Sequence, residues 1–186
     1  MKESTINSLL EWAKKEGAML DMIDVRYCGE DRGFGVFARR MIRVHEVFLR
    51  IPKHLMITAG LVAEMPAYKE ILERHRLEAF PILVLFFYLE AKNLQNSFFK
   101  PYFMSLPKSF DTPLAYNNST VEENIKMDQL PNRAKELLIK QQNEFTYIRE
   151  QLSRALDNTN LDMDHLNWAW HVVNTRCVYS ENPEHP

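Results

Sequence analysis

Residues 31–42 read DRGFGVFARRMI, and residues 46–58 read EVFLRIPKHLMIT. The first stretch contains the pattern G-x-G-x-x-A, which marks a dinucleotide site when a helix begins at the glycines. Such a site also requires an acidic residue about 20 positions later to hold the ribose. Residues 49–59 contain neither Asp nor Glu. We therefore interpret the glycines as parts of a β-turn, where they permit positive φ.

The residues around this turn alternate between apolar and polar positions, which is typical of strands. Ile23, Val25 and Tyr27 share one face of a predicted strand, and a short apolar strand follows over residues 36–38. A third strand is predicted over residues 46–51, since alternate positions are apolar and a proline then ends the ladder. The first sixty residues are thus predicted to be rich in strands.

The remaining segments have helical spacing. The predicted helices cover residues 4–17, with Ser4 as cap and Gly17 as stop, then residues 68–74, residues 78–93, the stretch from Pro131 to about Asp157, and the stretch from an Asp164 cap to Arg176. Residues 96–118 contain three prolines among large aromatic residues, which predicts an ordered, irregular connection.

The two opening stretches resemble, in order and spacing, the beginning of SET domains of the Rubisco-methyltransferase-like class of protein methyltransferases. Two later stretches are similar to further motifs of that class: FKPYFMSLPKSFDTPL over residues 99–114 and NWAWHVVNTRCVY over residues 167–179. The last stretch is most similar to the subgroup called SET domain-containing protein four. The resemblance implies an α+β fold, in which SET-domain β-sheets carry a large helical insertion.

The same resemblance implies a division of the chain. An N-terminal helix covers residues 1–20, the N-terminal part of the SET domain residues 21–90, the helical insertion residues 91–163, and the start of the C-terminal SET part residues 164–186. In the family, an N-H-S motif and a tyrosine at the methyl-transfer channel follow. Residues 180–186 match neither, and Tyr179 comes too early. We expect a truncated SET domain that lacks the catalytic tyrosine.

By resemblance, the chain is expected to be an S-adenosylmethionine-dependent protein-lysine N-methyltransferase. The implied contacts to S-adenosylmethionine come from the turn formed by Arg32, Gly33, Phe34 and Gly35, largely through its backbone. Thr175 and Arg176 are implied to line the cleft for cofactor and substrate. A structural alternative is that Arg176 only interacts favourably with the C-terminus of its helix. Residues 99–114 are interpreted as a structural connection.

The expected partner is a protein substrate with a histone or non-histone lysine, although a histidine acceptor stays open. The alternative function is that of a catalytically inactive shortened form that acts as a protein-interaction module.

Composition narrows the remaining classes of function. Hydrophobic residues make up 46% and charged residues 26% of the 186 residues, as in an ordinary globular protein. The formal net charge of -2 argues against nucleic acid as the main partner. The longest apolar stretch, residues 79–89, is about half of the ~20 residues that cross a bilayer. Two cysteines and no recognisable secretory signal predict a cytoplasmic or nuclear location, and no metal-binding spacing is present.

Overall fold

The computed structural model describes residues 3–30, 32–115 and 127–178. Its contacts divide the chain into two compact units, and each unit is built from separate stretches of sequence. Unit 1 consists of Met1–Ile57 and Asn93–Pro107, and unit 2 consists of Thr58–Lys92 and Lys108–Pro186. The four-part division expected from the sequence differs from this grouping and stays a prediction.

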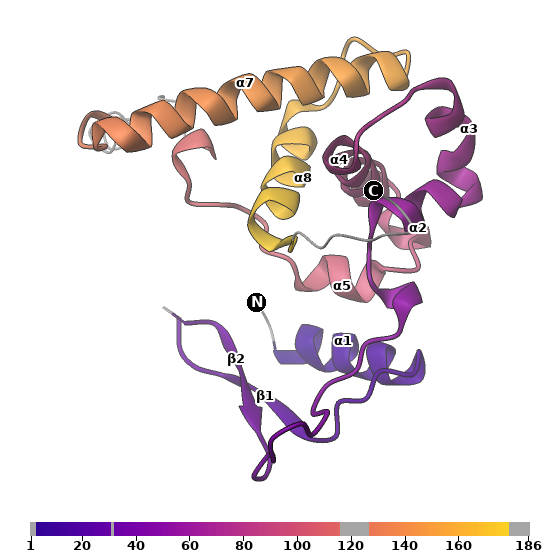
Figure 1. Cartoon of the computed structure of the whole chain (residues 1–186), viewed down its shortest axis with the longest axis vertical. Coiled ribbons are helices and arrows are strands. Elements are labelled where there is room, and N and C mark those ends of the chain that lie inside the picture. Colours follow the sequence, from indigo (N-terminus) through magenta and orange to yellow (C-terminus); the bar gives the residue numbers. More distant parts are fainter. Residues whose placement is uncertain (1–2, 31, 116–126, 179–186) are drawn as a thin grey trace. The chain divides into compact units, whose positions relative to one another are not determined.

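The described elements follow in chain order (Figure 1). Unit 1 contains α1 (Glu3–Lys15), β1 (Ile23–Tyr27), β2 (Phe34–Ala38), η1 (Lys53–Leu55), η2 (Leu94–Asn96) and α5 (Lys100–Ser105). Unit 2 contains α2 (Ala59–Glu64), α3 (Pro66–Arg74), α4 (Ala79–Lys92), η3 (Pro113–Ala115), α7 (Asn132–Ala155) and α8 (Met163–Arg176).

Helix α1 confirms the predicted N-terminal helix and packs against α5. It ends before Gly17, which takes the positive φ of 92° that a glycine adopts without strain. Ser4 is not its cap, because the helix already begins at Glu3. The indole ring of Trp12 meets the rings of Phe98 and Phe99 edge-on, with centroids 5.4 and 6.2 Å apart. These aromatic contacts attach α1 to the start of the second stretch of unit 1.

Strands β1 and β2 form an antiparallel hairpin in which Ile23 pairs with Ala38 and Tyr27 pairs with Phe34. Paired residues point to the same face, so one face is wholly apolar and is formed by Ile23, Val25, Tyr27, Phe34, Val36 and Ala38. Only the Ile23 end of this face is buried; there it joins a cluster with Ala13, Ala18 and Leu20. Near the turn the apolar face is open, since Tyr27 is 54% and Val36 65% exposed.

The prediction of a strand over residues 46–51 is wrong. The described residues there form only an isolated bridge, in which Met19 and Arg50 exchange backbone hydrogen bonds of 2.9 and 3.2 Å. The apolar alternation is real, but a strand also needs a neighbour along its length, and Val47 and Leu49 stay 50% and 39% exposed. Hydrophobic periodicity alone does not reveal whether a partner strand is available.

Unit 2 is organised around α4 and α8, which pack against each other. Five consecutive residues of α4, from Val84 to Tyr88, are buried, as expected of a helix that is apolar on all sides. Helix α7 is the longest described helix, and Figure 1 shows α8 running across it after the connection formed by residues 156–162. The N-cap of α8 is Asp162, whose carboxylate accepts the backbone N–H of His165 at 3.1 Å. The predicted cap, Asp164, instead lies in the first turn.

Residues 96–118 are partly helical, which the sequence prediction missed. Pro101 lies in the first turn of α5, where its missing N–H costs nothing, and η3 follows later in the stretch. Residues 116–118 lie outside the described part. Among the described residues, no helix is both long and apolar enough to cross a membrane.

Candidate functional site

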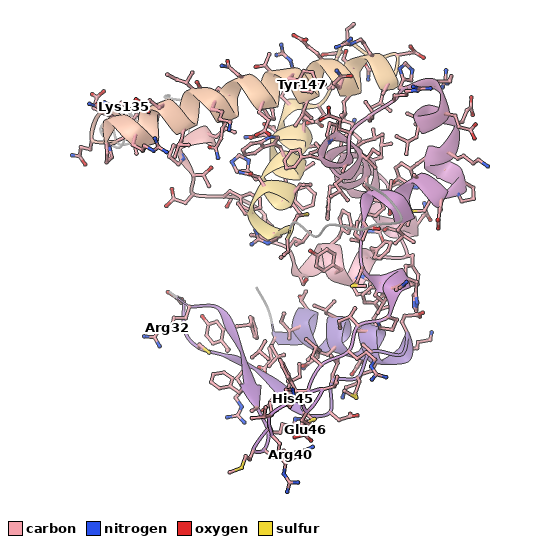
Figure 2. The ribbon with its side chains drawn as sticks, in the orientation of Figure 1. Arg32, Arg40, His45, Glu46, Lys135 and Tyr147 are labelled. Atoms are coloured by element: carbon pink, nitrogen blue, oxygen red, sulfur yellow. The ribbon has the colours of Figure 1, made fainter. Side chains whose placement is uncertain are left out.

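The predicted cofactor turn lies at the tip of the hairpin in unit 1. Gly29 and Gly33 have positive φ angles of 103° and 65°, and the turn is closed by hydrogen bonds from the N–H of Cys28 to the oxygen of Gly33 and from the N–H of Gly33 to the oxygen of Gly29. Arg32 is exposed at this tip, as Figure 2 shows. Gly33 therefore meets a conformational requirement of the turn that other residues satisfy only with strain.

The two glycines of the motif differ in their surroundings. Among the described residues other than Gly33 and its chain neighbours, no heavy atom lies within 4 Å of the position that a Cβ of Gly33 would occupy, so the space beside this backbone is open. A Cβ on Gly35 would lie 2.9 Å from Sγ of Cys28 and 3.1 Å from the ring of Phe37. The hairpin therefore needs a glycine at position 35, because a side chain there would come too close to Cys28 and Phe37. At Gly33, in contrast, the absence of a side chain leaves room for a ligand.

The register of the hairpin leaves backbone groups of β2 facing outward. Hydrogen-bonded and non-bonded pairs alternate along an antiparallel ladder. The N–H of Arg39 bonds to Met22 and the N–H of Cys28 bonds to Gly33, so the Tyr27–Phe34 pair is a non-bonded one. The N–H and C=O of Phe34 consequently point away from β1. In the described part of the chain the sheet has two strands, and no third strand uses these groups.

The polar face of the hairpin is held by ion pairs. Nε of Arg26 lies 2.7 Å from the carboxylate of Asp24, and Arg39 lies 3.8 Å from the same carboxylate. The hydrogen bond from Arg26 is the main cause that holds the pKa of Asp24 below its ordinary value. At the end of the hairpin opposite Arg32, Arg40 contacts Glu46 at 2.6 Å (Figure 2). Exposed ion pairs of this kind contribute little to the stability of the hairpin.

Thr175 and Arg176 lie at the C-terminal end of α8 in unit 2. The Thr175 hydroxyl donates to the backbone oxygen of His171 at 2.6 Å, and Nη1 of Arg176 donates to Oγ1 of Thr175 at 2.7 Å. The guanidinium carbon of Arg176 lies 5.1 Å from the ring centroid of Phe110. The position at the end of the helix also suits a cation electrostatically. The two candidate groups lie in different units.

His171 is a buried residue beside this group that the sequence analysis did not single out. It is 1% exposed, and its ring contacts that of Phe110 with centroids 5.1 Å and planes 21° apart. Burial lowers the pKa of His171 below its ordinary value. A lone histidine inside an apolar helix carries no spacing signal, so only its partners in space reveal it. Among the described residues, no group of acidic, histidine and cysteine side chains could hold a metal ion.

The fold of the chain matches solved SET-domain structures. Rubisco LSMT bound to sinefungin and monomethyllysine superimposes with a TM-score of 0.76 and 20% identity, covering 94% of this chain and 41% of that one. The SET domain of LSMT bound to lysine and AdoHcy gives a TM-score of 0.75 and 20% identity, covering 93% and 39%. The chain thus has the fold of these SET-domain structures, and the predicted α+β fold is confirmed.

Comparison of the sequence with curated proteins identifies named relatives. The actin-histidine N-methyltransferase of Xenopus tropicalis is 34% identical over 126 residues, which are 65% of this chain and 21% of that enzyme. The enzyme of the same name from Homo sapiens is 31% identical over 124 residues, which are 64% and 20%. The chain therefore spans about a fifth of the curated relatives it matches. No protein-family model matches it, and its placement beside SET domain-containing protein four stays a prediction.

Proposed function

We propose that this chain binds S-adenosylmethionine and contributes to methylation of a nitrogen on a protein side chain. The cofactor supplies an electrophilic methyl group on a sulfonium. The observation that carries the proposal is the open backbone of the turn at Gly33. Positive φ, free space where a side chain would lie, and the outward N–H and C=O of Phe34 together suit a backbone cradle for a polar ligand.

The roles of the individual residues follow from this proposal. Arg32, Gly33, Phe34 and Gly35 are the cofactor-binding turn, in which Gly33 provides the space and Gly35 permits the packing that holds the turn in shape. Thr175 and Arg176 line the cleft, where the guanidinium can hold a carboxylate through paired N–H donors. We assign no catalytic side chain. The described residues bind and orient the cofactor and the substrate. Holding reactants close together in the right orientation is by itself a large contribution to catalysis.

The acceptor nitrogen is the open part of the proposal. A lysine acceptor is what the sequence motifs predict, and the solved structures carry lysine or monomethyllysine. The curated relatives at 31% to 34% identity are histidine methyltransferases that act on actin. Histone and non-histone proteins of the cytoplasm or nucleus are the expected substrates. The two acceptors can be distinguished by measuring the transfer of a labelled methyl group to peptides that contain either lysine or histidine as the only acceptor.

The first test is calorimetric titration of the chain with S-adenosylmethionine. We expect micromolar binding, about -8 kcal/mol. Gly33→Leu fills the open space and should weaken binding at least tenfold. Gly29→Leu is the matched control, because Gly29 also has positive φ and open space in the same turn but lies outside the motif. Both variants add the same side chain at a position of positive φ in this turn, so equal losses of affinity would contradict a specific role for Gly33.

A second function is favoured by the open apolar face of the hairpin. Tyr27 and Val36 are both more than half exposed on this face. Single exposed apolar side chains are common on protein surfaces, but neighbouring ones on one face form a patch of the kind that binds partners. A folded chain that binds no S-adenosylmethionine would reject the first proposal for this polypeptide. It would leave the interaction module, with this face as its surface, as the function to test.

A further inference from the structure

The ring of Phe110 connects a candidate cleft residue to the buried part of unit 2. The Arg176 guanidinium carbon lies over this ring at 5.1 Å from its centroid, and the imidazole of His171 stacks on the same ring with centroids 5.1 Å and planes 21° apart. Arg176 is exposed, whereas His171 is buried. The ring of Phe110 thus contacts both an exposed side chain and a buried one.

His171 is fixed by two hydrogen bonds of 2.7 Å. Its Nδ1 lies against the backbone oxygen of Asn167, and its Nε2 lies against the hydroxyl of Thr112. A carbonyl oxygen can only accept, so Nδ1 carries the proton and donates it. In the neutral ring Nε2 then accepts from Thr112. Because Thr112 is two residues from Phe110, the imidazole holds this short segment at two points, through its edge and through its face.

Phe110 and Thr112 belong to the stretch 99–114, which the sequence analysis interpreted as a structural connection. We propose that Phe110 is a positioning residue for the candidate site, which holds the Arg176 guanidinium in the orientation that binds the ligand, while His171 holds Phe110. The proposal rests on the proposed function, because it assigns Arg176 a ligand to bind.

Positioning of this kind affects affinity through entropy. A free arginine side chain occupies many rotamers, and ordering it on binding opposes association. In this structure the order already exists: the ring face contacts the guanidinium, and Thr175 accepts a hydrogen bond from it at 2.7 Å. Cation–π contacts at such exposed places are modest in size. We therefore expect an effect of about three- to fivefold in ligand affinity when the ring is removed.

The contact itself is tested first in the unmodified chain by nuclear magnetic resonance. The Nε–H of Arg176, assigned from its loss in Arg176→Lys, should show cross-peaks to the ring protons of Phe110 and a ring-current shift. Absence of both would overturn the proposal, and this result does not depend on whether any cofactor binds or any variant folds.

The effect on function is tested with two substitutions of the ring. Phe110→Leu should weaken S-adenosylmethionine binding about three- to fivefold and remove the ring-current shift, while Phe110→Tyr keeps an aromatic face and should retain both. In an Arg176→Lys background, Phe110→Leu should have a smaller effect, because the positioned group is no longer a planar guanidinium. Equal losses in both backgrounds would mean that Phe110 only stabilises the fold, and would overturn positioning.

These measurements separate the two proposals. If the unmodified chain shows the Arg176–Phe110 cross-peaks but binds no cofactor, the proposed function fails while the contact stands. If the cofactor binds and Phe110→Leu binds it as tightly as the unmodified chain does, the proposed function stands and positioning by Phe110 fails.

Discussion

Gly35 shows how one residue of a motif can be required by packing. The space for its side chain is filled by Cys28, which directly follows β1, and by Phe37 of the same strand. Gly35→Ala should therefore destabilise the chain by about 1–3 kcal/mol, as overpacking does. Urea denaturation measures this loss. Cys28→Ala should recover part of it, since it removes the sulfur 2.9 Å away.

The double substitution is the informative comparison. A free energy of unfolding for Gly35→Ala with Cys28→Ala that equals the sum of the single effects would show that the sulfur and the added methyl group do not meet. For the same reason Gly35→Val is a poor probe of cofactor binding, because its first consequence is a distorted hairpin. The motif predicted a special glycine at this position, but the contact with Cys28 crosses the hairpin and only the structure reveals it.

His171 gives the chain a dependence of stability on pH. Burial lowers its pKa below the ordinary 6.5, so the folded chain keeps the imidazole neutral while the unfolded chain binds a proton. The unfolded state therefore holds more protons below pH 6.5, and stability falls as the pH drops from there through the folded pKa. The slope is at most about 1.4 kcal/mol per pH unit for one proton.

Chemical denaturation at a series of pH values between 7.5 and 5, a range of about two and a half units around that titration, measures this slope. His171→Gln keeps a neutral amide that can accept from Thr112, and in this variant the slope should be smaller. An unchanged slope would assign the acid sensitivity to groups other than His171.

At the scale of elements, α8 shows what local signals predict well. The helix and an aspartate cap were predicted, but the cap was assigned to Asp164, and the structure places it two residues earlier at Asp162. Asp162 accepts the backbone N–H of His165 at 3.1 Å and contacts its ring nitrogen at 2.7 Å. The backbone hydrogen bond is the first cause of its lowered pKa. Two aspartates stand near the start of this helix, and sequence-based helix boundaries are uncertain by one or two residues, so the choice between them requires the structure.

Asp162→Ala should lower the thermal midpoint of unfolding by about 2–4 °C, because an N–H at the helix start loses its acceptor. Asp164→Ala is the matched control: it removes the same carboxylate from the first turn, where the structure shows no capping hydrogen bond from that side chain. Scanning calorimetry of the two variants tests the assignment. A larger drop for Asp164→Ala would place the cap where the sequence first suggested it.

At the scale of the whole molecule, the sequence predicted elements that are formed by local contacts but did not predict contacts between segments that are distant in sequence. The hairpin and most helices follow from local periods and turn residues, because their hydrogen bonds join near neighbours in sequence. Residues 46–51 have the same apolar alternation, yet among the described residues only Arg50 forms a β-bridge to another segment. The grouping of residues 93–107 with the N-terminal stretch likewise depends on tertiary contacts that no local pattern encodes.

The isolated bridge between Met19 and Arg50 has a consequence for the order of folding. It joins two distant points of the chain, and the hairpin lies between them. Closing an unstructured loop loses entropy that rises with the logarithm of its length. A hairpin that forms first shortens the loop that remains to be closed, and hairpins form within microseconds. The bridge is therefore expected to close after the hairpin, with the turn at Gly33 as an early-formed structure and the backbone near Arg50 as a late one.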